Sequence, residues 1–224
     1  MTIDPVWEKK YSLGHMERYP WDMVVSFISH NTPKDVSRKD IRVLEVGFGT
    51  GSNLWFAARE GYSVYGIEGS SSAVKRANKR FKKNGLTGDL RTGDFTKLPF
   101  DDNMFDLVID RGALVCVGKQ AQKQAVSEIH RCLCNGGRFL HNPYSDSDSS
   151  VRNCEKGEDG LSVNITGGLA NSGHLCFNSR SELDDRFLVG WKLLQMQRRE
   201  CIDMLDTSGE VRADWIVIVE KILE

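Results

Sequence analysis

The sequence predicts an α/β fold in which a mostly parallel sheet carries helices on both faces. Three features support this prediction. An apolar run at residues 41–46 leads through three closely spaced glycines into a helical segment at 52–59. Short apolar strands then alternate with helices as far as residue 142, and two strands separated by a turn at 207–210 end the chain. Alternating strands and helices are typical of parallel sheets, and two consecutive final strands indicate an antiparallel hairpin.

The first strand, turn and helix carry the most informative pattern. Gly47, Gly49 and Gly51 follow the strand at alternate positions. Glycine is favoured where the backbone takes a positive φ or comes close to a ligand. The N-terminus of the helix that follows offers free backbone N–H groups to such a ligand. The pattern indicates a nucleotide-binding turn, and a tight turn without a ligand is the alternative interpretation.

The remaining core elements follow in order. Residues 62–70 form a strand ending near Glu68, and residues 70–84 form a helix with a basic face turned to solvent and an apolar face turned inward. Strands are predicted at 90–95, 107–110 and 138–142. A helix at 120–133 precedes the last of these, and the sequence Asn-Gly-Gly at 135–137 is expected to stop it. The final strands are predicted at 191–202 and 215–223.

Two segments outside this pattern define the domain organisation. Residues 1–40 form an N-terminal helical arm rich in aromatic side chains, with a helix at 21–28 directly after Pro20. These aromatics either dock the arm onto the sheet or form a lid over a ligand. Residues 41–224 form the main domain. Within it, residues 145–177 are an insertion rich in Ser, Asp, Gly and Asn, and long irregular segments of this kind are often functional.

Composition limits the partners. The 224 residues suit one α/β domain, and 30 basic against 31 acidic side chains give a net charge of −1. This balance does not suggest nucleic acid or an anionic membrane as a partner. The six cysteines are scattered without a metal-binding spacing, so we expect free thiols, a cytoplasmic location and no metal site. No signal peptide or membrane-spanning run is expected, and the oligomeric state is left open.

The motifs together resemble those of a known family. The order acidic-x-Gly-x-Gly-x-Gly, with Glu45 leading, resembles motif I of the class I S-adenosylmethionine-dependent methyltransferases. Glu68, at the end of the second strand, resembles motif II, and the Gly-Asp, Leu-Pro-Phe and Phe-Asp-Leu-Val sequences of residues 93–108 follow in the family's order. The resemblance covers residues 41–141. It implies a seven-stranded sheet with a C-terminal antiparallel hairpin, and S-adenosylmethionine as the cofactor.

The resemblance also implies roles for individual residues. The glycine turn lies against the methionine part and ribose of the cofactor, and Glu68 accepts hydrogen bonds from the ribose hydroxyls. Asp94 accepts a hydrogen bond from the adenine amine, and Asp110 and Arg111 close the fourth strand at the mouth of the site. The arm should close the other side of the pocket. The predicted cofactor-binding residues are Tyr11, Arg18, Glu45, Gly47, Gly49, Thr50, Gly51, Asn53, Glu68, Gly69, Ser70, Asp94, Phe95, Asp110 and Arg111.

The expected reaction is methyl transfer to a nucleophilic atom of a small-molecule acceptor. Size, balanced charge and the lack of an added recognition domain favour a small acceptor over a protein or nucleic acid. We expect the insertion and the arm to form the acceptor side of the pocket. His141 and His174 are the candidate general bases, because imidazole titrates near neutral pH. A structural or solvent-exposed role is the alternative for each of them.

Two other functions share part of the pattern. A nicotinamide-dependent oxidoreductase also uses a glycine turn and an acid after the second strand. It does not account for Asp94, and Ser52 stands where its fingerprint has the third glycine. A non-catalytic module that binds S-adenosylmethionine is the second alternative, because these enzymes need no universal catalytic residue.

Overall fold

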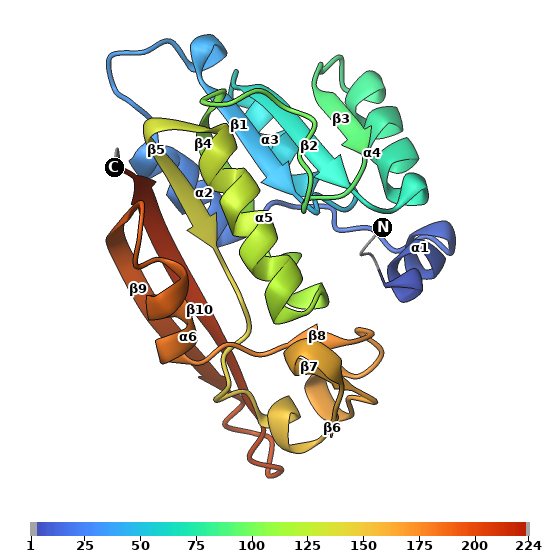
Figure 1. Ribbon diagram of the computed structural model, residues 1–224. Helices are drawn as coiled ribbons and strands as arrows, with labels where there is room; N and C mark the ends of the chain where they lie inside the picture. Colours follow the sequence, from blue (N-terminus) through green and yellow to red (C-terminus); the bar gives the residue numbers. More distant parts are fainter. Residues whose placement is uncertain (1–3, 223–224) are drawn as a thin grey trace.

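The computed structural model describes residues 4–222 and places a seven-stranded sheet between two layers of helices (Figure 1). The strand order is β3-β2-β1-β4-β5-β10-β9. The first five strands are parallel, and β10 is antiparallel to both β5 and β9. The fold class predicted from the sequence is therefore confirmed. The strands of this sheet are β1 (Arg42–Val46), β2 (Ser63–Glu68), β3 (Asp89–Thr92), β4 (Phe105–Asp110), β5 (Leu133–His141), β9 (Trp191–Ile202) and β10 (Val211–Lys221).

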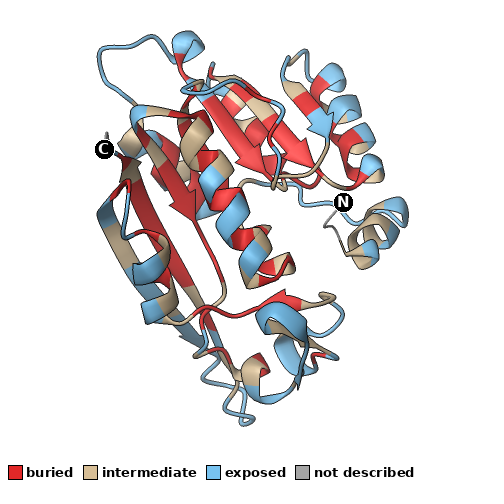
Figure 2. Cartoon of the chain, in the orientation of Figure 1, coloured by how far each residue is buried: buried red, intermediate tan, exposed pale blue. Residues whose placement is uncertain are grey.

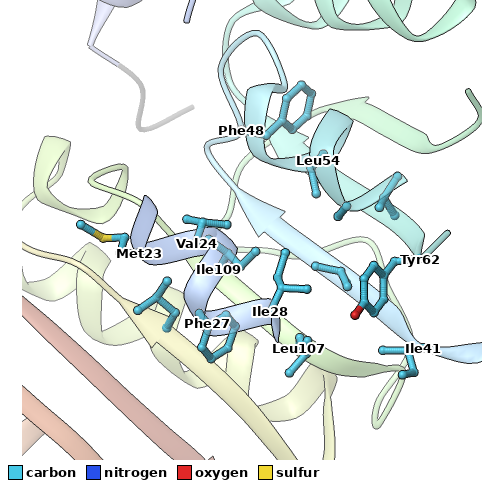
Figure 3. Close-up of a cluster of buried hydrophobic side chains, with 14 of the residues drawn as sticks. Met23, Val24, Phe27, Ile28, Ile41, Phe48, Leu54, Tyr62, Leu107 and Ile109 are labelled. Atoms are coloured by element: carbon cyan, nitrogen blue, oxygen red, sulfur yellow. The ribbon is translucent and has the colours of Figure 1, made fainter. Parts of the chain in front are cut away.

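Strand residues alternate between two hydrophobic clusters, one on each face of the sheet. In β4, Leu107 and Ile109 belong to the cluster shown in Figure 3, whereas Val108 belongs to the opposite one. This alternation follows from the two-residue period of a strand. The first cluster is covered by α2 (Asp22–Asn31), α3 (Ser52–Arg59) and α4 (Ser71–Lys83), and the second by α5 (Lys119–Cys132) and α6 (Arg180–Arg186). Figure 2 shows the central strands buried and the edge strand β9 largely exposed.

The N-terminal arm contains a helix that the sequence analysis did not place, α1 (Pro5–Ser12). Asp4 caps it, with its side chain accepting from the Val6 N–H, and Pro5 occupies the first turn, where no N–H is needed. Glu8 in turn caps α4: its carboxylate accepts from the Ser70 hydroxyl and from the backbone N–H and hydroxyl of Ser72. The arm is thus fixed beside the carboxyl end of β2.

The insertion 145–177 is more regular than its composition predicts. It forms a small three-stranded antiparallel sheet, β6 (Glu155–Lys156), β7 (Leu161–Val163) and β8 (Leu175–Cys176), with short 3₁₀ turns between the strands. Two side chains tie it to the final strand. Asp148 accepts from the Ala213 N–H at 3.0 Å, and the Ser149 hydroxyl accepts from the Val211 N–H at 2.8 Å.

Several predicted boundaries differ from the structure. The sequence Asn-Gly-Gly at 135–137 does not stop α5, because Leu133 is already extended and pairs with Phe105. These residues lie inside β5, where Gly136, with φ of 74°, accompanies a shift of register against β4. The last strand begins at Val211, four residues before the predicted start at 215. Helix α6 was not predicted, although Ser179 and Glu182 form a capping box, which is a sequence signal for the start of a helix.

Within residues 4–222, every helix is too short or too polar to cross a membrane.

Candidate functional site

A cavity of about 770 Å³ opens at the carboxyl ends of β1, β2 and β4. Parallel α/β sheets place ligands at this edge. Four parts of the chain line the cavity: the ends of the parallel strands, the N-terminal arm, the insertion with the segment leading into it, and the final hairpin. Of the predicted cofactor-binding residues, the lining includes Tyr11, Gly47, Glu68, Gly69, Asp94, Phe95 and Arg111. Segments far apart in the sequence therefore line the same cavity.

The glycine turn takes the conformation that its composition predicts. Gly47, Gly49 and Gly51 have φ values of 65°, 54° and 74°, in the left-handed region that other residues avoid. The turn is also crowded: a Cβ on Gly47 would lie 2.2 Å from the Cβ of Ala113. A Cβ on Gly49 would lie 2.7 Å from the Tyr11 hydroxyl, so the arm reaches directly over the turn.

Glu68 is held rigidly at the end of β2. Its side chain is buried, and its two carboxylate oxygens accept from the Gly49 and Ser70 N–H groups, each at 2.8 Å. Burial raises the pKa of Glu68, and these N–H groups oppose the rise. A carboxylate oxygen has lone pairs beyond those two bonds. The residue can therefore accept further hydrogen bonds from a ligand in the cavity.

Glu45 lies behind the glycine turn and has an unsatisfied oxygen. Its Oε1 accepts from the Asn53 amide at 2.7 Å, and Asn53 in turn accepts from the Trp21 N–H. Its Oε2 is buried and has no hydrogen-bond partner among the residues that the structure describes. Burial raises the pKa of Glu45 to about 8. Glu45 does not line the cavity, so a contact of this oxygen with the amino group of S-adenosylmethionine stays a prediction.

Asp110 organises the end of β4. It is fully buried, and its Oδ1 accepts from the N–H groups of Ala113 and Leu114 at 2.8 and 3.0 Å. Its Oδ2 lies 2.7 Å from Nδ1 of His141. These contacts fix the turn that packs against Gly47. Asp110 therefore holds the turn after β4 in place and does not itself line the cavity.

The structure places both predicted general bases, His141 and His174, outside the cavity lining. His141 is fully buried between Asp110 and Arg186, whose guanidinium donates to Nε2 at 3.0 Å. Since arginine only donates, Nδ1 must carry the ring proton, and burial lowers the pKa of His141. Nδ1 of His174 lies 3.0 Å from a carboxylate oxygen of Asp4, so this ring joins the insertion to the arm. Neither ring lines the cavity, and a base role is not supported for either.

Other predicted positions support the site without lining it. Arg18 is exposed, and its carbonyl accepts from Arg80. Ser70 caps α4, and its hydroxyl accepts from the Ala73 N–H. Thr50, Gly51 and Asn53 are buried between the glycine turn and α3. These contacts give the four polar residues structural partners, so a direct contact with a ligand stays a prediction for each.

The sequence analysis missed several residues of the cavity wall. From the arm come Trp7, His15 and Trp21, and from the turn after β4 comes Cys116. The aromatic content of the arm was a signal, but it did not single out these positions. Further lining residues come from the segment 144–175 and the final hairpin, and no local pattern marks them: Tyr144, Asp148, Leu169, Leu175, Arg199 and Arg212.

Comparison with known proteins identifies the family. Residues 43–137 match the family model described as a methyltransferase domain. The phosphatidylethanolamine N-methyltransferase of Cereibacter sphaeroides is 35% identical over 142 residues, which cover 62% of this chain and 68% of that protein. The chain belongs to the class I S-adenosylmethionine-dependent methyltransferase family.

Other methyltransferases are similar over shorter stretches. The phthiotriol/phenolphthiotriol dimycocerosates methyltransferase of Mycobacterium tuberculosis is 33% identical over 119 residues, 52% of this chain and 42% of that protein. The chain thus spans well under two thirds of that relative's length. Among solved structures, a SAM-dependent methyltransferase of Methanosarcina mazei aligns with a TM-score of 0.70 and 17% identity, covering 92% of this chain and 100% of the other. This likeness shows the shared fold.

We expect Glu45 to make the stability of this protein depend on pH. Its folded pKa of about 8 exceeds the ordinary 4.5, so the folded state keeps a proton that the unfolded chain releases above about pH 4.5. The free energy of unfolding should therefore fall as the pH rises toward 8. Glu45→Gln removes this titration. The free energy of unfolding is measured with urea at about pH 5 and pH 8. Between these pH values, the difference between the variant and the wild type should shift by more than about 1 kcal/mol in favour of the variant. An unchanged difference would mean that Glu45 is ionised throughout.

Proposed function

We propose that this methyltransferase transfers the methyl group of S-adenosylmethionine to a small-molecule acceptor. The observation that carries the proposal is that one cavity of about 770 Å³ joins the family's motif residues to walls supplied by the arm, the insertion and the hairpin. A cavity of this size has room for the cofactor and a compact acceptor together. The names of similar proteins include lipid and quinone methyltransferases, which is consistent with an acceptor of this class.

The chain's contribution to the reaction is mainly alignment. The cofactor supplies an activated methyl on its sulfonium. The glycine turn and Glu68 hold the ribose end, and Asp94 and Phe95 hold the adenine end. Tyr11 covers the turn from the arm, and the insertion closes the opposite wall and excludes water. We place the reaction in the cytoplasm, since the six cysteines are free thiols.

The test combines binding and transfer. Calorimetry of the purified protein with S-adenosylmethionine and with NAD should show saturable binding of the first and none of the second. Incubation with radiolabelled S-adenosylmethionine and fractions of small metabolites should then label an acceptor. Binding of NAD alone would overturn the family role. Cofactor binding without transfer to any fraction would support a non-catalytic module instead.

Glu68→Ala is expected to weaken S-adenosylmethionine binding by about 1–3 kcal/mol. The substitution removes a charge-assisted acceptor and leaves the ribose hydroxyls unpaired. It also frees the N–H groups of Gly49 and Ser70, so a thermal unfolding curve must accompany the calorimetry. Glu60→Ala, on the exposed end of α3, is the matched control and should bind normally. Normal binding by a stable Glu68→Ala protein would remove this residue from the cofactor site.

A further inference from the structure

The carboxyl end of β4 presents one cation to the cavity in an unusual setting. Arg111 lines the cavity, and its guanidinium carbon lies 3.6 Å from the centroid of the Trp21 ring. This stacking fixes the plane of the guanidinium. Its Nε is buried and has no hydrogen-bond partner within residues 4–222. A stacked guanidinium with an unsatisfied donor indicates a site prepared for an acceptor of hydrogen bonds.

No described carboxylate pairs with this charge. None of the ion pairs among the described residues includes Arg111. The neighbouring Asp110 is committed to two backbone N–H groups and His141. Burial raises the pKa of Glu45 to about 8, although the charge of Arg111 opposes the rise, so this carboxyl is mostly protonated near neutral pH. The Tyr144 hydroxyl is within hydrogen-bonding reach of Arg111, but a phenol leaves the positive charge in place.

The carboxylates that line the cavity are engaged elsewhere or exposed. Asp148 accepts from two backbone N–H groups, and Asp214 forms a two-point ion pair with Arg199. Glu200 pairs with Arg198. Glu17 lies exposed on the arm. Glu68 and Asp94 line the cavity as well, and each accepts hydrogen bonds from neighbouring groups. Since no ion pair among the described residues includes Arg111, its guanidinium charge favours a negative group of a bound molecule.

The same end of the cavity lacks a general base. Burial raises the pKa of the Cys116 thiol to about 12, and it raises the pKa of Tyr144 as well. Both groups keep their protons near neutral pH. The imidazole that lines the cavity, His15, packs against Tyr11 in a tilted arrangement with ring centroids 5.5 Å apart, and Tyr11 covers the glycine turn. His15 thus belongs to the wall formed by the arm.

We propose that the acceptor reacts as an anion whose negative charge is paired with the Arg111 guanidinium. A carboxylate, thiolate or acidic phenolate meets this requirement. The lone pair of the anion forms the new bond to the methyl carbon, the carbon–sulfur bond breaks, and its electron pair stays on sulfur. A negative nucleophile and a positive sulfonium give two neutral products, so no proton moves and no base is needed. This inference rests on the proposed methyl transfer, and it assigns Arg111 to the acceptor and no longer to the cofactor.

The test measures binding of two probes to the protein saturated with S-adenosylhomocysteine. Benzoate and benzamide have nearly the same shape, but only benzoate is charged. Ligand-detected NMR titration should show benzoate binding at least about tenfold more tightly than benzamide. Arg111→Met should abolish this preference and leave S-adenosylhomocysteine affinity within about threefold. Arg111→Lys keeps the charge and should retain part of the preference for benzoate. This variant shows whether the loss in Arg111→Met comes from the missing charge or from a folding defect. Arg212→Met removes a second, exposed cation of the same cavity wall and should lower the preference much less than Arg111→Met does.

The other outcomes separate the alternatives. Equal binding of the two probes to the wild type would overturn the inference and leave methyl transfer intact. A tenfold loss of S-adenosylhomocysteine affinity in Arg111→Met would mean that this residue holds the cofactor, which also overturns it. If Arg212→Met lost as much of the preference for benzoate as Arg111→Met, the preference would come from the overall positive charge of the cavity, and the specific pairing with Arg111 would be wrong. Failure of the wild type to bind S-adenosylhomocysteine would overturn the proposed function and this inference with it.

Discussion

Gly47→Ala is expected to abolish cofactor binding, with a loss of at least about 100-fold in affinity. The added Cβ would lie 2.2 Å from the Cβ of Ala113, a distance that forces the backbone apart. The residue also has φ of 65°, which costs an alanine about 1 kcal/mol more. Ala113 cannot retreat easily, because its N–H is bound to the buried Asp110. We therefore expect the turn to move into the cavity and stability to fall by about 2–4 kcal/mol.

Gly136→Ala is the matched control for this substitution. Gly136 has φ of 74°, but a Cβ there meets nothing within 4 Å, and the residue lies in β5 away from the cavity. It should cost only the conformational strain, about 1 kcal/mol, and leave binding unchanged. Calorimetry with S-adenosylmethionine and thermal unfolding of both variants would check this. Normal cofactor affinity in Gly47→Ala would show that the glycine turn is not part of the binding site.

Asp110→Ala is expected to destabilise the protein by about 3–5 kcal/mol. The substitution leaves the Leu114 N–H and the Nδ1–H of His141 without an acceptor in a buried environment, and it also removes the acceptor of the part-buried Ala113 N–H. Unpaired buried donors are costly, and two of them lose their acceptor at once. The turn against which Gly47 packs would also lose its anchor. Urea denaturation with a probe of the global transition gives the free energy of unfolding directly.

Two variants sharpen the interpretation of Asp110. Asp106→Ala, on the same strand, removes one exposed hydrogen bond to the Arg42 N–H and should cost under about 1 kcal/mol. The loss of stability in Asp110→Asn should lie between those of Asp106→Ala and Asp110→Ala. Its NH₂ group would face either the Nδ1–H of His141 or the backbone donors, and Arg186 prevents the ring from moving its proton to Nε2. A loss in Asp110→Ala no larger than in Asp106→Ala would contradict the role of Asp110 as the anchor of this network.

The amino-acid sequence determined the core of the fold and the cofactor side of the site. The apolar run of β1, the three glycines after it and the acid at the end of β2 are contiguous patterns, and each acts through its own backbone or its immediate neighbours. Their chemistry can be recognised locally for that reason. The order of strands and helices followed from the same periodicities. Glu68 and Gly47, predicted from these patterns as cofactor-binding residues, both line the cavity.

Only the tertiary structure decided the proposed acceptor side of the cavity. The cavity wall there joins Trp21, Arg111, Tyr144 and Arg212, which lie on separate elements and share no local pattern. Histidine at 141 or 174 looks like a base in the sequence, because residue type gives no information about burial. Packing places His141 between Asp110 and Arg186 and fixes its proton on Nδ1. Whether a polar side chain reacts or supports depends on which distant residues surround it, and folding alone sets those neighbours.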